Sequence, residues 1–409
     1  MLFRYKIALL NVLRNRRRSV LTLLAIQVGV ISLVLFGGFV ASMSDGMREN
    51  MIRSELGHLQ IYKKGFNQYG HIEPEKYLLS QSDLTQITHI VEAITGVELI
   101  TPRLDFSGLL TNGNQSIAIV GNGINPDKEA LLSSAITITQ GEDLFPQDSD
   151  GALLGQGLFN ALNTKVGDYL TLLSSTTDGA VNAVDIKVVG AINTGVRDVD
   201  NRLIRINLPH AQDLQFTDGI SRLVVLLSET DNTQVVIKQL NEIFEKEKLP
   251  LEIKSWSQLA DYYHEVVKLF EGVFGFIKVI VLFIAALSIA NTMMMAVMER
   301  TPEIGSIRAL GATRYEIMML FLTEAFYLGI FGSVLGVLFG ILLANGITLA
   351  EFIMPTPPGS SQSYPIRIFI EWPVLWQTAI TGIFVAVIAS IYPAFKASRL
   401  LINQAMRSA

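Results

Sequence analysis

The charged segment between two of the chain's long apolar stretches decides how the rest is organised. It reads Glu299-Arg300-Thr301-Pro302-Glu303-Ile304-Gly305-Ser306-Ile307-Arg308-Ala309-Leu310-Gly311-Ala312-Thr313-Arg314. Pro302 suits the N1 position of a helix, and Gly311 suits a C-terminal cap. Between them Ile304, Ile307 and Leu310 recur at the spacing of one helical face. The segment therefore predicts a short amphipathic helix.

The residues of this helix are consistent with two interpretations. It is either an interfacial connector lying among lipid headgroups, as many basic and apolar loops are, or a knob that docks into a cytoplasmic partner. In the second reading Glu303 and Arg308 form its charged rim.

The composition favours a membrane protein. Half of the 409 residues are hydrophobic and the mean hydropathy is +0.39, which is more apolar than an ordinary soluble chain. The absence of cysteine excludes disulfides, thiolate nucleophiles and iron–sulfur clusters. The five histidines show no ligand spacing, so we expect no metal.

Four stretches are long enough to cross a bilayer, which takes roughly 20 apolar residues. The expected transmembrane helices are 20–43, 279–298, 317–347 and 374–392. The first could instead be a cleaved signal peptide, but its apolar run exceeds the roughly 7 to 15 residues of such a segment. We expect a retained helix.

Basic residues in the short flanks predict the orientation, because Lys and Arg resist translocation. Residues 1–19 and 393–409 carry basic residues and no acid, so both termini are expected in the cytoplasm. The cytoplasmic loop is then 299–316, and the outer segments are 44–268 and 348–373. The segment 44–268 holds 18 basic and 30 acidic residues, so positive charge does not oppose its translocation.

The outer segment 44–268 combines short β-like runs with two helical windows. Runs at 58–62 and 97–104 flank a helical stretch at 83–94. Runs at 222–227 and 251–256 flank a helix that Asp231 opens as N-cap and that continues to about Lys246. The two units look like halves of one split βαβ lobe, 57–104 with 207–256.

The insert between these halves, 105–206, reads as mostly β, with runs at 117–120, 169–173 and 185–192. The expected fold class is an α-helical membrane protein with four transmembrane helices plus an α+β extracytoplasmic domain.

A helical stalk, 257–278, is expected to join this domain to the second span. Apolar residues at 259, 263, 266, 270, 273 and 277 have heptad spacing, typical of a helix that packs along another. Continued to Met298, this gives about 40 residues, or roughly 60 Å, of nearly continuous helix. The first span extends likewise through Met47, Met51 and Ile52. Such helices would either transmit motion between the membrane and the outer domain or act as rigid spacers. The periodicity of the apolar residues does not distinguish these two roles.

Two features stand out in the third span. Gly332, Gly336 and Gly340 recur every four residues, which predicts close approach of another helix, in the same or a second protomer. Glu324 is costly in lipid and hence a functional candidate, although it lies near the cytoplasmic end, where interfacial water is within reach.

The run from Met294 to Gly311, followed by the glycine-rich third span, resembles the signature of MacB/FtsX-type ABC permeases. The layout of one span, a large outer domain and three further spans is similar over essentially the full chain. Short outer motifs resemble the lipoprotein-releasing LolC/LolE branch in particular: Leu154–Leu158, Val166–Asp168, Val188–Gly190 and Thr194–Gly195.

The resemblance implies a mechanotransmission permease whose outer domain has a porter-like lobe and a β-rich insert. It makes 299–316 the coupling helix received by an ATPase, and assigns that role to Glu299, Arg300, Glu303, Ile304, Gly305, Ile307, Arg308, Leu310 and Gly311. The implied partners are two copies of a cytoplasmic ABC-type ATPase, a second permease that is identical or homologous, membrane lipid, and a lipoprotein substrate or periplasmic adaptor, with no nucleic acid. ATP and Mg²⁺ belong to the ATPase, and this chain is expected to bind no cofactor.

The rival class is a membrane-anchored enzyme. No Gly-x-x-x-x-Gly-Lys-Ser/Thr segment occurs, so the chain has no P-loop of its own. His264-Glu265 opens a zinc-protease motif, but Lys268 stands where the second histidine belongs. We expect no catalytic residues. Release of lipoproteins from the inner membrane is the favoured function, with MacB-like export or FtsX-like activation of a periplasmic enzyme as alternatives.

Overall fold

The computed structural model describes residues 14, 16–70, 72–353, 356, 359–361, 363 and 365–400. Most residues of the two terminal segments expected in the cytoplasm, 1–19 and 393–409, lie outside this part. The described chain forms two compact units. The helical unit comprises residues up to 45, 265–353 and 365 onward; the α/β unit comprises 46–264 and 354–364.

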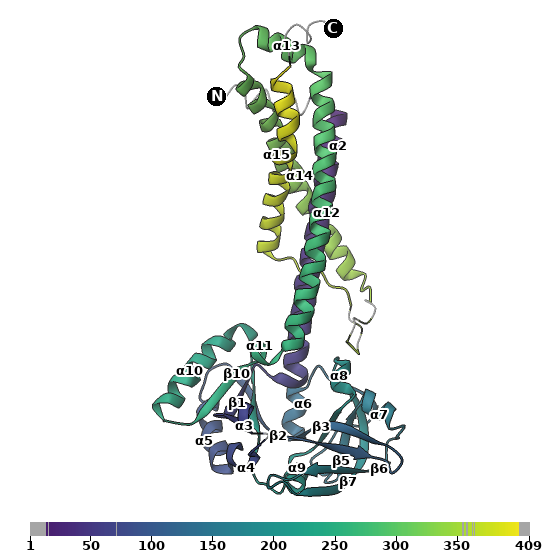
Figure 1. Ribbon diagram of the computed structural model, residues 1–409, viewed down its shortest axis with the longest axis vertical. Coiled ribbons are helices and arrows are strands. Elements are labelled where there is room, and N and C mark those ends of the chain that lie inside the picture. The colour runs from purple at the N-terminus through teal and green to yellow at the C-terminus, as the bar shows by residue number, and fades with distance from the viewer. Residues whose placement is uncertain are drawn as a thin grey trace. The chain divides into compact units, whose positions relative to one another are not determined.

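Within the described residues, four helices are long and apolar enough to cross a membrane (Figure 1). They are α2 (Arg16–Met51), α12 (Asp261–Glu299), α14 (Arg314–Leu349) and α15 (Trp372–Ser398). Each contains one of the four expected apolar stretches. Their shared core includes Ile26, Val30, Ile289, Phe321 and Ala386.

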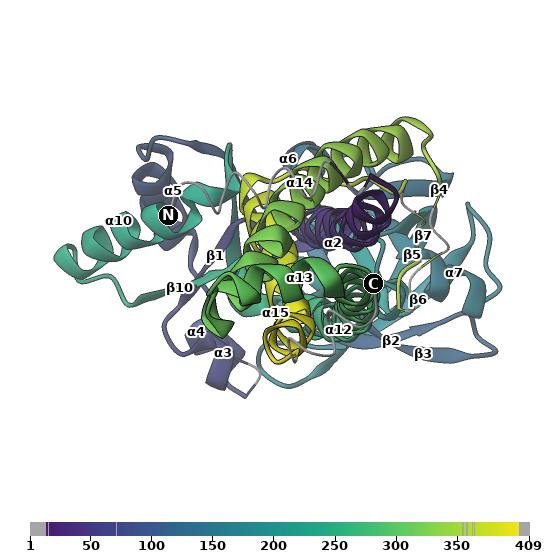
Figure 2. The same ribbon diagram turned by 90° about the horizontal axis from the view of Figure 1, so that it is seen from above.

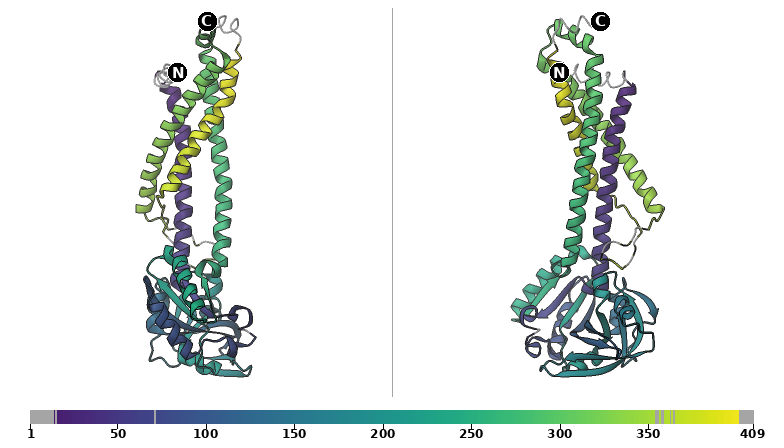
Figure 3. Two further views of the ribbon diagram at one scale, coloured as in Figure 1. Left: turned by 90° about the vertical axis from the view of Figure 1, so that its left-hand side faces the viewer. Right: turned by 45° about the vertical axis from the view of Figure 1, so that its right-hand side comes forward.

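Helices α2 and α12 run side by side in the helical unit (Figure 3). The rings of Phe36 and Phe274 meet between them, with centroids 5.6 Å apart. The short helix α13 (Thr301–Ala309) connects α12 to α14 and crosses the ends of the long helices (Figure 2).

Both α2 and α12 are longer than a bilayer requires, as expected. A π-helical turn, η1 (Ile52–Leu56), follows α2 directly. The expected helix of about 40 residues is α12, which has 39 residues. It starts two residues later than Leu259, because Ala260 leaves the helical conformation and separates it from the short helix α11 (Trp256–Leu259).

The first lobe of the α/β unit is the expected split βαβ arrangement. Its strands β1 (Leu59–Lys63), β2 (Val97–Thr111), β9 (Arg222–Leu227) and β10 (Leu251–Ser255) lie in the antiparallel order β10-β1-β9-β2. Helices α5 (Gln81–Glu92) and α10 (Thr233–Lys246) connect β1 to β2 and β9 to β10. Their apolar sides contribute Ile87, Val91, Val236, Leu240 and Phe244 to the core of this lobe.

The expected N-cap of α10 was wrong. Asp231 lies inside a 3₁₀ turn, η2 (Thr230–Asn232), and α10 starts two residues later. Asn232 takes the cap position without a side-chain hydrogen bond to the helix.

The second lobe is the insert between β2 and β9, and it continues the same ten-stranded sheet within the described residues. Its strands are β3 (Ser116–Ile124), β4 (Thr137–Gly141), β5 (Gly151–Gly155), β6 (Tyr169–Ser175), β7 (Val181–Asn193) and β8 (Leu203–Asn207). The long strand β2 belongs to both lobes, since its first half pairs with β9 and its second half with β3 and β6.

Short helices complete the unit: α3 (Phe66–Tyr69), α4 (Pro74–Tyr77), α6 (Pro126–Leu132), α7 (Gln156–Ala161), α8 (Arg197–Asp200) and α9 (Leu208–Gln215). The core of the second lobe is built from residues such as Leu104, Phe106, Leu154, Val188 and Ile204.

Candidate functional site

The expected coupling segment is a helix with defined ends. Arg300 holds the N-cap position and α13 starts at Thr301, so Pro302 lies one residue later than the expected N1 position. At the other end Gly311, which follows the C-cap Leu310, has a φ of +100°. Side chains rarely adopt that conformation, which explains glycine at this place.

The three apolar residues of this helix do not share one environment, contrary to expectation. Ile304 is buried at 3% exposure, whereas Ile307 is 39% and Leu310 is 89% exposed. Leu310 lies at the cap, beyond the last helical residue, and so leaves the face that Ile304 occupies. The helix packs through Ile304 and Gly305 and displays Ile307 and Leu310.

The start of α13 is fixed to α14 by a buried ion pair. One guanidinium nitrogen of Arg300 donates to both carboxylate oxygens of Glu324, at 2.8 and 3.1 Å. Glu324 is only 6% exposed, and the Arg300 guanidinium lies over the ring of Phe321. Glu324 is therefore a packed partner of the coupling segment rather than a carboxylate in interfacial water.

Glu303 and Arg308, the expected charged rim of α13, both form hydrogen bonds within the chain. Glu303 accepts hydrogen bonds from Arg300 at 3.1 Å and from Arg14 at 2.6 Å. Burial by itself would raise the pKa of Glu303. The hydrogen bonds and positive charges of these two guanidinium groups lower it by more, so the pKa of Glu303 lies below its ordinary value. Arg308 donates to the main-chain carbonyl of Leu400. A further ion pair joins Glu299, at the end of α12, to Arg18 of α2 at 3.0 Å.

The three glycines of the third span lie against α2 of the same chain. A Cβ added at Gly332 would lie 2.8 Å from Ile26, at Gly336 2.7 Å from Val30, and at Gly340 3.0 Å from Val34. The contacted residues also recur every four positions, so a ridge of branched side chains on α2 fills the glycine groove of α14.

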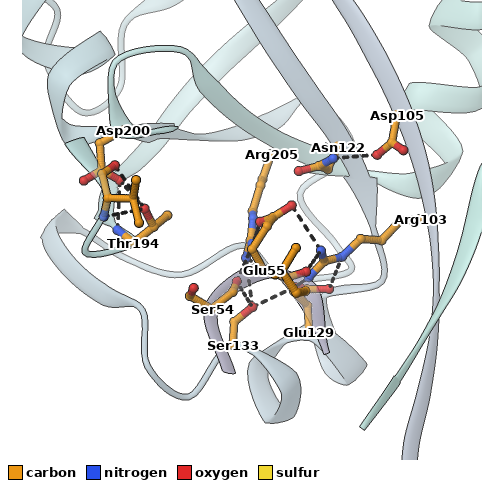
Figure 4. Close-up of polar contacts among 12 residues, drawn as sticks. Ser54, Glu55, Arg103, Asp105, Asn122, Glu129, Ser133, Thr194, Asp200 and Arg205 are labelled. Carbon is orange, nitrogen blue, oxygen red and sulfur yellow. Dashed lines mark hydrogen bonds and ion pairs between the residues drawn. The ribbon is translucent and has the colours of Figure 1, made fainter. Parts of the chain in front are cut away.

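Sequence reasoning missed a cluster of charged residues in the α/β unit, shown in Figure 4. Arg103 on β2 and Arg205 on β8 both pair with Glu129 of α6 and with Glu55 of η1. The Arg103 side chain is 0% exposed and that of Arg205 is 3% exposed. This group is hereafter the junction cluster, because it joins the turn η1 to both lobes.

Glu129 and Arg103 of the junction cluster stabilise each other's charged forms despite their burial. Burial raises the pKa of Glu129, but the positive charges of Arg103 and Arg205 lower it below its ordinary value. Burial lowers the pKa of Arg103, but Glu129 and Glu55 raise it above the usual value. A basic residue inside a short apolar run, as in Leu-Ile-Arg205-Ile-Asn, is the sequence signal that could have identified the cluster.

The loop between α14 and α15 contributes a second feature that the sequence did not suggest. Ser360 pairs with Val196 as an isolated β-bridge. Ser361 donates its main-chain N–H to the Gly195 carbonyl at 3.1 Å and its hydroxyl to Asp200 at 2.6 Å. Asp200 is 2% exposed. Residues 359–361 are therefore hydrogen-bonded to the second lobe.

Among the described residues, no group of three or more His, Cys, Asp or Glu side chains is arranged to hold a metal ion. His264, the residue that suggested a protease, forms a 2.8 Å hydrogen bond from its ring to the carbonyl oxygen of Ser257.

Two family models match the chain. The model described as FtsX-like permease C-terminal matches residues 275–402, and the model described as MacB-like periplasmic core domain matches residues 19–243. The second match alone spans more than half of the chain.

Curated relatives resemble the chain at low identity but over long alignments. The lipoprotein-releasing system transmembrane protein LolC of Neisseria meningitidis is 25% identical over 415 residues, covering 96% of this chain and 95% of the relative. LolE of Haemophilus influenzae is 25% identical over 329 residues, covering 76% and 77%. The macrolide export ATP-binding/permease protein MacB of Campylobacter jejuni is 23% identical over 359 residues, covering 83% of this chain and 53% of the relative.

Proposed function

The chain belongs to the family of FtsX-like permeases with a MacB-like periplasmic core domain, and we propose that it is the permease subunit of an ATP-binding cassette transporter. This transporter releases lipoproteins from the bacterial inner membrane. Two observations support the lipoprotein branch. The similarity to LolC spans nearly the whole of both chains, and a second lipoprotein-releasing relative matches over three quarters of this one.

The proposal includes an orientation. Both termini and α13 lie in the cytoplasm, and the α/β unit lies in the periplasm, as the basic flanks favour. The four apolar helices then cross the membrane with the permease domain facing both compartments.

The energy source is a separate ATPase in this proposal. The sequence of this chain has no P-loop, and LolC, which matches over 96% of it, is named as the transmembrane protein of a lipoprotein-releasing system. We propose two copies of the ATPase per transporter, each binding ATP and Mg²⁺.

The observation that carries the mechanism is the arrangement of α13. Its outer side displays Ile307 and Leu310, while its N-terminus is fixed to α14 by the ion pair of Arg300 with Glu324. An ATPase that bound the displayed side chains and moved would push on a helix that cannot tilt freely. The long helices α2 and α12 would then carry the displacement to the periplasmic lobes.

A substrate cavity requires a second permease in this proposal. The apolar cavity among α2, α12 and α15, lined by residues such as Gly29, Leu282 and Ala285, has a volume of only about 10 Å³. A space of this size holds no acyl chain, because even one water molecule takes about 10–15 Å³. We propose that an identical or homologous partner completes an apolar site beside α2 and α12.

Export of another envelope substrate is the second candidate, and the match to MacB over 83% of this chain favours it. Purification of the tagged chain from its native membrane in mild detergent separates the two functions. Mass spectrometry should find a stoichiometric ATPase and trapped lipoprotein, and the eluate should hydrolyse ATP. An ATPase accompanied by a periplasmic adaptor, with no lipoprotein, would favour export; recovery of the chain alone without ATP hydrolysis would refute both.

A further inference from the structure

The second lobe of the α/β unit contains a cavity of about 170 Å³. One part of its lining comes from α6 and the residues that follow this helix, and another part comes from strands β5, β7 and β8 and the end of β3. All of the lining residues belong to the α/β unit. A core cavity of roughly 150 Å³ can bind benzene, so this cavity has room for an organic group of about six heavy atoms.

The sheet side of the cavity is apolar. It is lined by Ile124, Leu153 and Ile192, whose exposed fractions are 2%, 3% and 1%. These side chains form a small core cluster with Leu144 and Leu203. The cavity is therefore a gap beside a packed core, where a ligand has to leave its hydration water behind. An aliphatic group gains free energy from that transfer, whereas a polar group without a partner loses it.

The cavity lining also includes the buried guanidinium of Arg205. Its two terminal nitrogens donate to the hydroxyl of Ser133 at 3.0 Å, the carbonyl of Ser54 at 2.9 Å and the carboxylate of Glu55 at 2.7 Å (Figure 4). The ε nitrogen is buried as well, and no acceptor for it lies among the described residues. A buried donor without an acceptor is unfavourable, so an oxygen atom brought by a ligand would be stabilised here.

The charges around the cavity favour a neutral ligand. Arg205 is already paired with Glu55 and with Glu129, at 2.7 and 3.3 Å. Glu129 and Asp143 both line the cavity, so a ligand with a negative charge would approach two carboxylates. A carbonyl oxygen accepts a hydrogen bond without adding charge, and it therefore suits this site better than a carboxylate does.

We propose that this cavity binds a neutral aliphatic group that carries a carbonyl oxygen, which is the chemistry of a leucine residue with its peptide carbonyl. The aliphatic part lies against Ile124, Leu153 and Ile192, and the carbonyl oxygen accepts from the ε nitrogen of Arg205. A free short peptide and a segment of a larger protein both offer this chemistry. The site does not depend on the proposed transport function, because none of its residues belongs to α13 or to a membrane helix.

Saturation-transfer NMR with N-acetyl-leucine N-methylamide tests the site in the full-length protein in lipid nanodiscs, with empty nanodiscs as the blank. The probe should bind saturably with about millimolar affinity, as so small a ligand does. N-acetyl-asparagine N-methylamide should bind about tenfold more weakly, because the apolar lining leaves its side-chain amide unpaired. N-acetyl-leucine should also bind about tenfold more weakly, because its carboxylate is repelled. No saturable binding of the first probe, or equal affinity for all three, would overturn the proposal.

Variants of the lining locate the probe. Ala130→Phe and Ser134→Phe introduce a ring at two exposed positions of the lining, and each should weaken the leucine probe by about tenfold by occupying its space. Leu131→Phe is the matched control, because Leu131 is a 65% exposed residue of α6 outside the lining. Unchanged affinity in both lining variants would show that the probe binds elsewhere.

Arg205→Lys tests the hydrogen bond, because it keeps the charge and removes the ε nitrogen. It should weaken the leucine probe by about tenfold, and unchanged affinity in the folded variant would exclude Arg205 as the donor. The variants of Ala130 and Ser134 decide on the cavity whether or not Arg205→Lys folds.

A capped pentapeptide, Gly-Gly-Leu-Gly-Gly, distinguishes the two sources of the ligand. Tighter binding than that of the single capped residue would identify a segment of a longer chain as the ligand. Weaker binding, with the single residue still bound, would identify a free small molecule.

Discussion

Arg300 and Glu324 lie 24 residues apart in sequence but form a buried ion pair with N–O distances of 2.8 and 3.1 Å. The pair joins the N-terminus of α13 to the third span. Under the proposed function Glu324 would hold α13 in place and so help to transmit force, a role that its position in an apolar helix alone did not reveal.

Breaking this pair should uncouple the two ends of the transporter. Glu324→Gln leaves the Arg300 guanidinium without its carboxylate, which typically costs about 3 kcal/mol for a buried pair. We expect a lower thermal stability and continued ATP hydrolysis with little transport. The double variant Arg300→Met/Glu324→Leu should recover stability but not coupling, because no lone charge remains. A Glu324→Gln protein with normal transport per ATP would contradict the role of the pair.

The displayed side of α13 should carry the ATPase contact. Leu310→Asp and Ile307→Asp place charges on exposed apolar side chains and should weaken ATPase binding by about 10-fold, as loss of an interface anchor does. Membrane insertion and thermal stability should not change, since neither residue is buried. Ser306→Asp, on an exposed position of the same helix, is the control. Titration of the purified ATPase against each variant measures the effect; equal affinities for all three would exclude this contact.

The glycine groove of α14 gives a test with an internal control. Gly336→Leu would overlap Val30 of α2 and should destabilise the helical unit by about 1–3 kcal/mol. A Cβ added at Gly346, on the same helix, would meet no atom within 4 Å, so Gly346→Leu should have little effect. Thermal unfolding of the two variants in one detergent checks the difference. Equal unfolding temperatures would mean that α2 does not pack against this groove in the membrane.

His58 makes the first lobe sensitive to acid. The ring is 1% exposed; its Nδ1 accepts from the N–H of Leu227 at 3.0 Å, and its Nε2 bonds to Thr230 at 2.9 Å. Burial lowers the pKa of His58 to about 4, with Arg53 and Arg48 adding to the effect and Glu49 opposing it. Because the folded pKa lies below the unfolded value of about 6.5, the unfolded chain binds the extra proton first.

Stability should therefore be complete above pH 6.5 and should decline as the pH falls from 6.5 to 4, by up to about 3 kcal/mol. His58→Gln should be less stable at pH 7.5 but should lose less between pH 7.5 and 5. Hydrogen exchange of β1 and β9 in the full-length protein measures the change. If the stability of the wild-type protein fell no more steeply with decreasing pH than that of the variant, His58 would not be the cause of the acid sensitivity.

The contact of residues 359–361 with the second lobe can be trapped. Val196 and Ser360 are bridge partners, so Val196→Cys/Ser360→Cys should form an intramolecular disulfide under mild oxidation in an otherwise cysteine-free chain. Each single variant is the control. We expect crosslinking within one polypeptide, detected by a mobility shift that a reductant reverses; only intermolecular dimers would place this loop elsewhere.

The elements that could be predicted from the sequence were those with a long, regular pattern of apolar residues. Four apolar stretches and two strand–helix–strand units were enough to predict the membrane helices and the split βαβ lobe. Strands β5 and β8 were missed because each is five residues long and fully buried, with no alternation of polar and apolar residues to mark it.

The candidate site was predictable only in part, since its contacts join residues far apart in sequence. The spacing of Gly332, Gly336 and Gly340 predicted a close neighbour but not that α2 supplies it. The arginines that pair with Glu55 come from β2, β8 and β9, and no local pattern relates them. The spacing of apolar residues predicted that Leu310 shares a helical face with Ile304. That prediction was wrong because the spacing does not show that the helix ends before Leu310.

The central claim is that ATP hydrolysis by a separate subunit, acting through α13, drives release of lipoprotein from the membrane. The most direct test is a release assay in proteoliposomes that contain the chain, the ATPase and second permease that co-purify with it, and a native lipoprotein. ATP should release lipoprotein into the soluble fraction, and Leu310→Asp in this chain should abolish release. ATP hydrolysis that responds to the permease while lipoprotein stays in the membrane would contradict the claim.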